Sequence, residues 1–188
     1  MPHAGLKIVV PGTVEDAQNL LYSALLDPNP VLYFEHKKLY RSLKEITPDK
    51  PVYEPLGKAK IQREGTDATI ITYGMGVQWA LDAAHSYSKE GISLEILDLR
   101  CLAPLDLEAI KATVKKTNRV LLLQEPSITM GPMSEVASLI NEHCFEQLDA
   151  PVLRVAPIDT PIPFNKKLEE GYMNLANLDI QLRKLLDY

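Results

Sequence analysis

Residues 67–188 alternate between short apolar runs and amphipathic stretches. Four apolar runs have the length and composition of buried strands: 69–73, 94–97, 120–123 and 152–155. Four stretches with apolar residues at helical spacing predict helices: 77–89, 106–116, 132–147 and 176–186. Strands that alternate with helices are typical of a mostly parallel sheet with helices on both faces. The sequence therefore predicts an α/β fold for this part of the chain.

Residues 1–44 follow a strand–helix–strand pattern. An apolar run at 6–10 precedes Thr13, which has the N-cap side chain of a helix, with Asp16 in the first turn. One face of this helix is predicted to be apolar: Val14, Ala17, Leu20, Leu21, Ala24 and Leu25. The run 31–34 is apolar on both faces, as in a central, covered strand. Two strands and one helix cannot bury these faces alone, so we expect the end of a domain whose beginning lies upstream.

Residues 45–66 carry three prolines among charged residues and show no sustained period. This composition predicts an extended interdomain connector, with a short edge strand near 58–61. The expected division of the chain is thus 1–44, 45–66 and 67–188.

The composition limits the classes of partner and the setting that we expect for this protein. The net charge of −5, with scattered lysines and arginines, argues against nucleic acid. No apolar run approaches the length of a membrane span, and no leader peptide is visible. Cys101 and Cys144 lie far apart without a metal-binding pattern, so we expect two buried thiols and a reduced intracellular setting.

Ligands of a parallel sheet bind beyond the carboxyl ends of its strands. Gly74-Met75-Gly76 lies at one such end, but position 79 is Trp79 and not the third glycine of a dinucleotide fingerprint, so a tight turn is expected. Asp98 and Arg100 are predicted to pair with each other or with Glu125. His85 and His143 lie on predicted helices without a second metal ligand, so we expect them at the surface. The residues alone indicate no catalytic machinery.

The turn Asp27-Pro-Asn-Pro30 follows a predicted helix end. The last carbonyls of a helix lack partners and carry partial negative charge, and Asp27 and Asn29 add side-chain oxygens beside them. Two interpretations remain open: a nest for a hard cation, or an Asx turn that only shapes the chain.

Several short motifs, in order along the whole chain, resemble the beta subunit of thiamine-diphosphate-dependent 2-oxo acid dehydrogenases. They are Gly5-Leu-Lys-Ile-Val-Val-Pro11, Thr13-Val-Glu-Asp-Ala17, Asp27-Pro-Asn-Pro30, Gly57-Lys-Ala-Lys60, Glu64-Gly-Thr-Asp67, Asp98-Leu-Arg100, Asp149-Ala-Pro-Val152 and Asp159-Thr-Pro161. The stretch Phe34-Glu-His-Lys-Lys-Leu-Tyr-Arg41 is more similar to the branched-chain (2-oxoisovalerate) members than to the pyruvate members.

The resemblance implies that residues 1–44 end a pyrimidine-binding domain and that 67–188 form a transketolase-type C-terminal domain. It covers only the C-terminal half or a little more of such a subunit. The parent enzyme would be an oxidoreductase that decarboxylates a 2-oxo acid on thiamine diphosphate and magnesium and acylates a lipoyl arm. Because the family's activating glutamate and catalytic histidine lie upstream of the Gly5 motif, we expect this chain to be inactive alone and to bind no thiamine diphosphate.

The resemblance also implies a structural potassium site. Matching residue by residue, its ligands here are the carbonyl of Ala24 and the oxygens of Asp27 and Asn29, with the carbonyl of Leu25 as a further candidate. Other family ligands come from an upstream segment, so we expect weak binding by this chain.

The partners implied by the resemblance are a symmetry-related beta subunit, an alpha subunit and the subunit-binding domain of the acyltransferase. The implied location is the bacterial cytoplasm or the mitochondrial matrix. Two alternatives remain: a stand-alone, non-catalytic assembly module, and the C-terminal part of a transketolase or deoxyxylulose phosphate synthase. An in-frame coding region upstream of Met1 would favour a fragment over the module.

Overall fold

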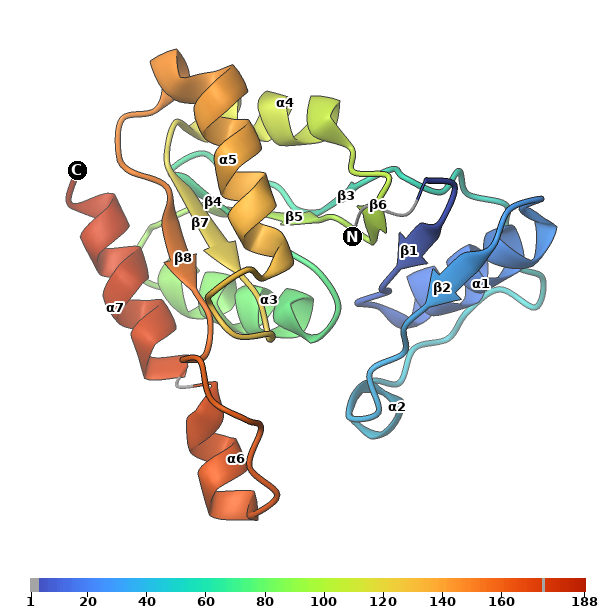
Figure 1. The fold of residues 1–188 in the computed structure, drawn as a ribbon. Coiled ribbons are helices and arrows are strands. Elements are labelled where there is room, and N and C mark those ends of the chain that lie inside the picture. Colours follow the sequence, from blue (N-terminus) through green and yellow to red (C-terminus); the bar gives the residue numbers. More distant parts are fainter. Residues whose placement is uncertain (1–3, 174) are drawn as a thin grey trace.

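The structure is a computed structural model that describes residues 4–173 and 175–188, and it contains two sheets (Figure 1). The larger sheet has five strands in the order β3–β5–β4–β7–β8. Their bounds are β3 Lys60–Arg63, β4 Ala68–Thr72, β5 Leu94–Asp98, β7 Val120–Leu123 and β8 Leu153–Val155. All neighbours in this sheet are parallel except β3, which runs antiparallel to β5 at the edge. The predicted parallel sheet and its edge strand are therefore confirmed.

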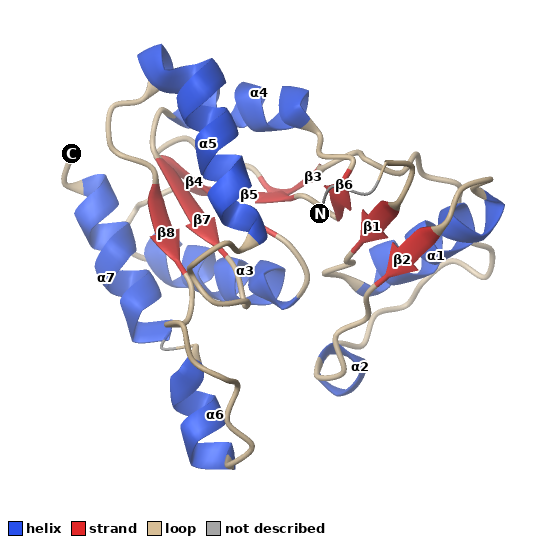
Figure 2. Cartoon of the chain, in the orientation of Figure 1, coloured by secondary structure: helices blue, strands red, loops and turns tan. Residues whose placement is uncertain are grey.

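Helices cover both faces of this sheet (Figure 2). They are α3 Met75–Ser88, α4 Leu107–Thr117, α5 Pro132–Cys144 and α7 Leu175–Leu186, and a short 3-10 turn, Phe145–Gln147, follows α5. Side chains of α3 and α7 pack on one face with Ile70, whereas α4 and α5 pack on the other with Ile71. Because neighbouring residues of a strand point to opposite faces, β4 is buried on both sides and contributes to both cores.

The smaller sheet has three strands in the order β2–β1–β6. β1 (Lys7–Val9) and β2 (Val31–Tyr33) are parallel, and helix α1 (Val14–Leu26) connects them. β6 (Cys101–Ala103) runs antiparallel to β1 and directly follows β5, so a strand from the C-terminal part completes this sheet. Sequence analysis missed β6, because three residues before a proline have no periodicity of their own.

Helix α1 begins as predicted, since the Thr13 hydroxyl oxygen accepts a hydrogen bond from the Asp16 backbone N–H at 3.2 Å. The face that it buries was predicted only in part, since Leu20 is buried but most of its buried neighbours on the helix are polar. Its buried residues are Asp16, Asn19, Leu20 and Ser23, whereas Leu25 of the predicted apolar face is 77% exposed. The physical reason is that a polar segment of the chain, residues 48–54, lies along α1 and bonds to its polar side chains.

Strand β2 lies at the edge of the smaller sheet, and its side chains are only partly covered. Leu32 is 37% exposed and Phe34, just after the strand, is 48% exposed. The expected cover on both faces is not supplied by the described residues. Two short helices, α2 (Leu39–Ser42) and α6 (Lys166–Tyr172), were also not predicted, and α6 projects from the body of the larger unit (Figure 1).

Candidate functional site

The Asp27 turn follows α1 and combines an Asx turn with an ion pair. One carboxylate oxygen of Asp27, Oδ1, accepts hydrogen bonds from the backbone N–H of Asn29 at 3.0 Å and from its side-chain amide at 3.3 Å. The other, Oδ2, is bonded to the Lys7 ammonium. These bonds, that from Lys7 first, hold the pKa of Asp27 below its ordinary value. The carbonyl of Ala24 accepts the Asp27 N–H at 3.4 Å.

The predicted cation ligands are thus close together, but Asp27 and the Ala24 carbonyl are already engaged by hydrogen-bond donors. Asp27 faces a lysine, and the Asn29 amide nitrogen points its hydrogens at the same carboxylate. A hard cation needs about six oxygens, more than this turn offers. The Asx-turn interpretation accounts for the geometry, and potassium binding by Ala24, Asp27 and Asn29 stays a prediction.

The Gly74-Met75-Gly76 segment is a tight strand-to-helix turn. Gly74 has φ +56°, in the region that favours glycine. A Cβ on Gly76 would lie 2.0 Å from Thr72 Oγ1, which is buried and donates to the Leu123 carbonyl at 3.0 Å. Glycine is therefore required here for close packing of α3 on the sheet, in agreement with the expected turn.

A buried charged cluster joins the two sheets. The guanidinium of Arg100 bonds to the Asp16 carboxylate at 2.9 Å, to the Glu54 carboxylate, and to the Lys58 carbonyl at 2.9 Å. The Arg100 side chain is 5% exposed and that of Asp16 is 0% exposed. We call Asp16, Glu54 and Arg100 the junction cluster, because they come from α1, the connector and the β5–β6 turn.

The predicted pairing of Asp98 with Arg100 is wrong for the guanidinium. Asp98 Oδ1 instead accepts the backbone N–H of Arg100 at 2.9 Å, and Oδ2 lies 3.4 Å from the Gln62 amide. Asp98 is fully buried, and the loss of solvation raises its pKa to about 7. Arg100 has a left-handed backbone, at φ 54°, and its guanidinium contacts Asp16 of α1 instead.

Glu125, the other predicted partner of Asp98 and Arg100, pairs instead with His36 in the segment 1–44. Its carboxylate oxygen lies 2.9 Å from Nε2 of His36. His36 follows β2, so this contact and the junction cluster tie the two units at two places. Sequence analysis missed both because each bond joins residues more than forty positions apart.

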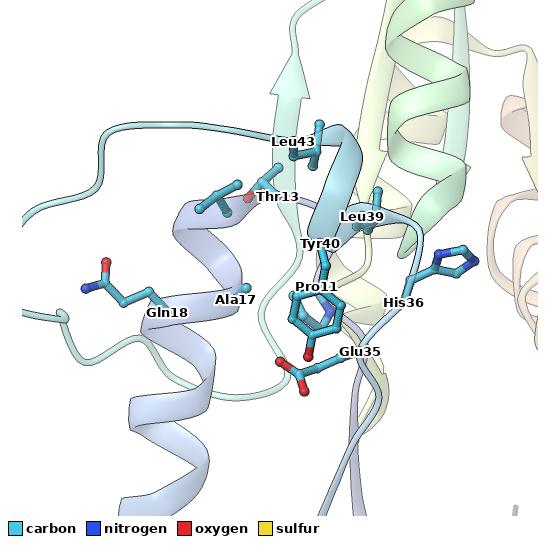
Figure 3. A pocket seen from close by; sticks show the side chains of 10 residues that line it. Pro11, Thr13, Ala17, Gln18, Glu35, His36, Leu39, Tyr40 and Leu43 are labelled. Carbon is cyan, nitrogen blue, oxygen red and sulfur yellow. The ribbon is translucent and has the colours of Figure 1, made fainter.

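A pocket of about 370 Å³ lies beyond the carboxyl ends of β1 and β2 (Figure 3). Its lining is mainly apolar, from the start of α1 and from the loop around α2, and includes Val14, Ala17, Leu39 and Leu43. Figure 3 shows the Tyr40 hydroxyl directed at the Glu35 carboxylate, and this hydrogen bond raises the pKa of Tyr40.

The remaining candidates agree with the sequence analysis. His85 and His143 are exposed, and Cys101 and Cys144 are buried, with burial raising the pKa of both thiols. Within residues 4–173 and 175–188, no three histidine, cysteine or acidic side chains are placed to hold a metal ion. None of the described helices has both the length and the apolar character needed to cross a membrane.

The architecture defines an α/β unit with a mostly parallel five-stranded sheet, next to a three-stranded sheet that carries helix α1. A family model, "Transketolase, C-terminal domain", matches residues 57–177, so the chain belongs to this family. The predicted fold class is thereby confirmed.

Two curated relatives from Bacillus subtilis are similar over 98% of this chain. The 2-oxoisovalerate dehydrogenase subunit beta is 45% identical, and the pyruvate dehydrogenase E1 component subunit beta is 43% identical. The chain spans 57% of the length of each, corresponding to a C-terminal half. These matches confirm the resemblance identified from the motifs.

A solved structure, titled a split gene transketolase in an inactive beta4 tetramer, has a TM-score of 0.77 at 25% identity. The similarity covers 97% of this chain and 58% of that one.

Proposed function

We propose that this chain acts as the C-terminal part of the beta subunit of a 2-oxo acid dehydrogenase and serves subunit assembly. The observation that carries the proposal is its similarity, over 98% of its length, to beta subunits of two such enzymes. The higher identity to these subunits, against 25% for the split-gene transketolase, favours this function over a transketolase.

Unpartnered apolar surfaces support a role in assembly. In the segment 1–44, Leu25 and Leu26 of α1 are 77% and 58% exposed, and β2 has a free edge. On the C-terminal unit, Phe164 and Leu168 near α6 are 105% and 64% exposed. Apolar patches of this kind mark protein–protein contacts. We propose that the α1–β2 surface meets the upstream part of the subunit and that the α6 arm meets a second beta subunit or the alpha subunit.

The parent enzyme is proposed to use thiamine diphosphate with magnesium. The described residues do not fit this group, because the magnesium-bound diphosphate needs an oxygen-rich metal site that they do not form. We therefore assign no catalytic step to these residues. The stretch 34–41 supports a branched-chain substrate, and the proposed location is the bacterial cytoplasm or the mitochondrial matrix.

Calorimetry tests whether this chain serves assembly without binding the cofactor itself. Thiamine diphosphate and magnesium titrated into the isolated chain should give no binding heat. Micromolar binding by this chain alone would contradict a purely assembling role.

A further inference from the structure

The segment that follows β2 carries an unusual charge for this protein. Four cations lie within eight residues, Lys37, Lys38, Arg41 and Lys44, although the chain has a net charge of −5. All four are exposed, and among the described residues no hydrogen bond or ion pair engages their ammonium or guanidinium groups; Lys38 is bonded only through its backbone, by the side chains of His36 and Ser42. By contrast, Lys7, Lys60 and Lys116 each pair with a carboxylate. The four charged groups thus have no partner among the described residues. We call the segment that carries them, residues 37–44, the basic loop.

The basic loop adjoins the apolar pocket beyond β1 and β2. Lys37, Lys38 and Arg41 line a surface hollow together with Tyr40, and Tyr40 also lines the pocket. The two cavities therefore share one wall. On the other side of Tyr40, the Glu35 carboxylate lies at the pocket (Figure 3). An anion is thus repelled at the pocket and attracted at the hollow.

From this arrangement we propose that the basic loop and pocket bind an acidic segment of a partner protein. One apolar side chain of the segment enters the pocket between Ala17 and Leu39, and carboxylates next to it lie over Lys37, Lys38 and Arg41. Burying the apolar anchor gives affinity, and the charge pattern fixes the direction of the segment. The site uses the start of α1, whereas the α1–β2 surface proposed above is defined by Leu25 and Leu26 at the end of that helix. The inference does not depend on the proposed function.

Fluorescence anisotropy with a defined probe tests the proposal on the full chain. The probe is a labelled peptide of four glutamates followed by one phenylalanine. We expect micromolar binding that weakens as salt is added, because surface charges are screened. Replacing the phenylalanine by glycine should weaken binding about tenfold, and replacing the glutamates by glutamine should weaken it at least as much.

Variants of the chain locate the site. Lys37→Glu combined with Lys38→Glu should weaken binding of the original probe about tenfold. Ala17→Leu, which fills the pocket, should weaken the phenylalanine peptide and leave the glycine peptide unchanged. Lys184→Glu on α7 is the matched control and should bind the original probe like the natural chain.

Three outcomes would overturn the proposal. They are equal affinity of the phenylalanine and glycine peptides, unchanged binding by the doubly reversed variant, and binding of citrate alone as tightly as the peptide. The first comparison changes only the probe, so it stays informative even if the Ala17 variant fails to fold.

Discussion

Replacing Arg100 with methionine tests whether the junction cluster holds α1 and the connector against the larger sheet. Methionine keeps an unbranched, apolar side chain but removes the guanidinium. The fully buried Asp16 carboxylate then loses its cation at 2.9 Å, and the nearest remaining one is the Lys60 ammonium at 3.8 Å. The Lys58 carbonyl also loses the donor on Arg100, and Glu54 keeps only the amide of Asn19.

The expected loss of stability follows from this burial. Removing one partner of a buried ion pair costs about 3–5 kcal/mol, because an uncompensated charge stays behind. Glu54 is 23% exposed and regains water, and Lys60 remains near Asp16, so we expect the lower end, about 3 kcal/mol. This is a large fraction of the roughly 5–15 kcal/mol that stabilises a typical domain.

Urea unfolding, followed by circular dichroism and by the fluorescence of Trp79 on α3, measures the change. Amide hydrogen exchange then locates it, and α1 should lose protection before β4 and β7. Adding Asp16→Asn to the Arg100 variant should recover part of the loss, because the unpaired charge is gone. Arg183→Met is the control, since this arginine is 52% exposed and should matter little. A loss under about 1 kcal/mol, or equal deprotection of α1 and β4, would refute the reasoning.

Three further predictions concern single sites. Asp98, whose pKa is raised to about 7, favours the folded state when protonated, so stability should fall by at most about 4 kcal/mol from pH 4 to 7. Asp98→Asn should melt higher than the natural chain near pH 8 and equally near pH 4, and identical pH profiles would contradict this. Gly65→Ala should cost about 1–3 kcal/mol in urea unfolding, because its Cβ would lie 2.2 Å from the backbone of Leu94, whereas Gly171→Ala, with open space around it, should cost nothing. Lys7→Met frees the Asp27 carboxylate, so the melting temperature of this variant should be higher in potassium chloride than in lithium chloride. The same difference in the natural chain would show that Lys7 does not block the site.

The repeating part of the fold was predictable from sequence because its signals are local. The four parallel strands and four main helices of the larger unit were found within a few residues, since each has its own apolar periodicity. Strand β6 and the short helices α2 and α6 were not, because they span three to seven residues. β6 exists only because β1, far away in the sequence, pairs with it.

The candidate sites show the same limit. The turn at Asp27 was found because its proline and Asx signals are contiguous, and its Asx bonds are present. The role of Asp16 was predicted only in part. Its place in the first turn of α1 was predicted, but its bond to Arg100 was not, because the two residues lie 84 positions apart. The buried polar face of α1 was missed because periodicity finds apolar stripes, whereas here the connector supplies hydrogen bonds to Asn19 and Ser23.

Reconstitution of an active enzyme tests the central claim most directly. This chain would be combined with the upstream part of the Bacillus subtilis 2-oxoisovalerate dehydrogenase subunit beta and its alpha subunit, with thiamine diphosphate and magnesium. Decarboxylation of 2-oxoisovalerate and of pyruvate would be measured with and without the chain. The account predicts cofactor-dependent turnover only when the chain is present, faster with 2-oxoisovalerate. Co-purification of all parts with no turnover of either acid, or turnover by the other parts without this chain, would contradict it.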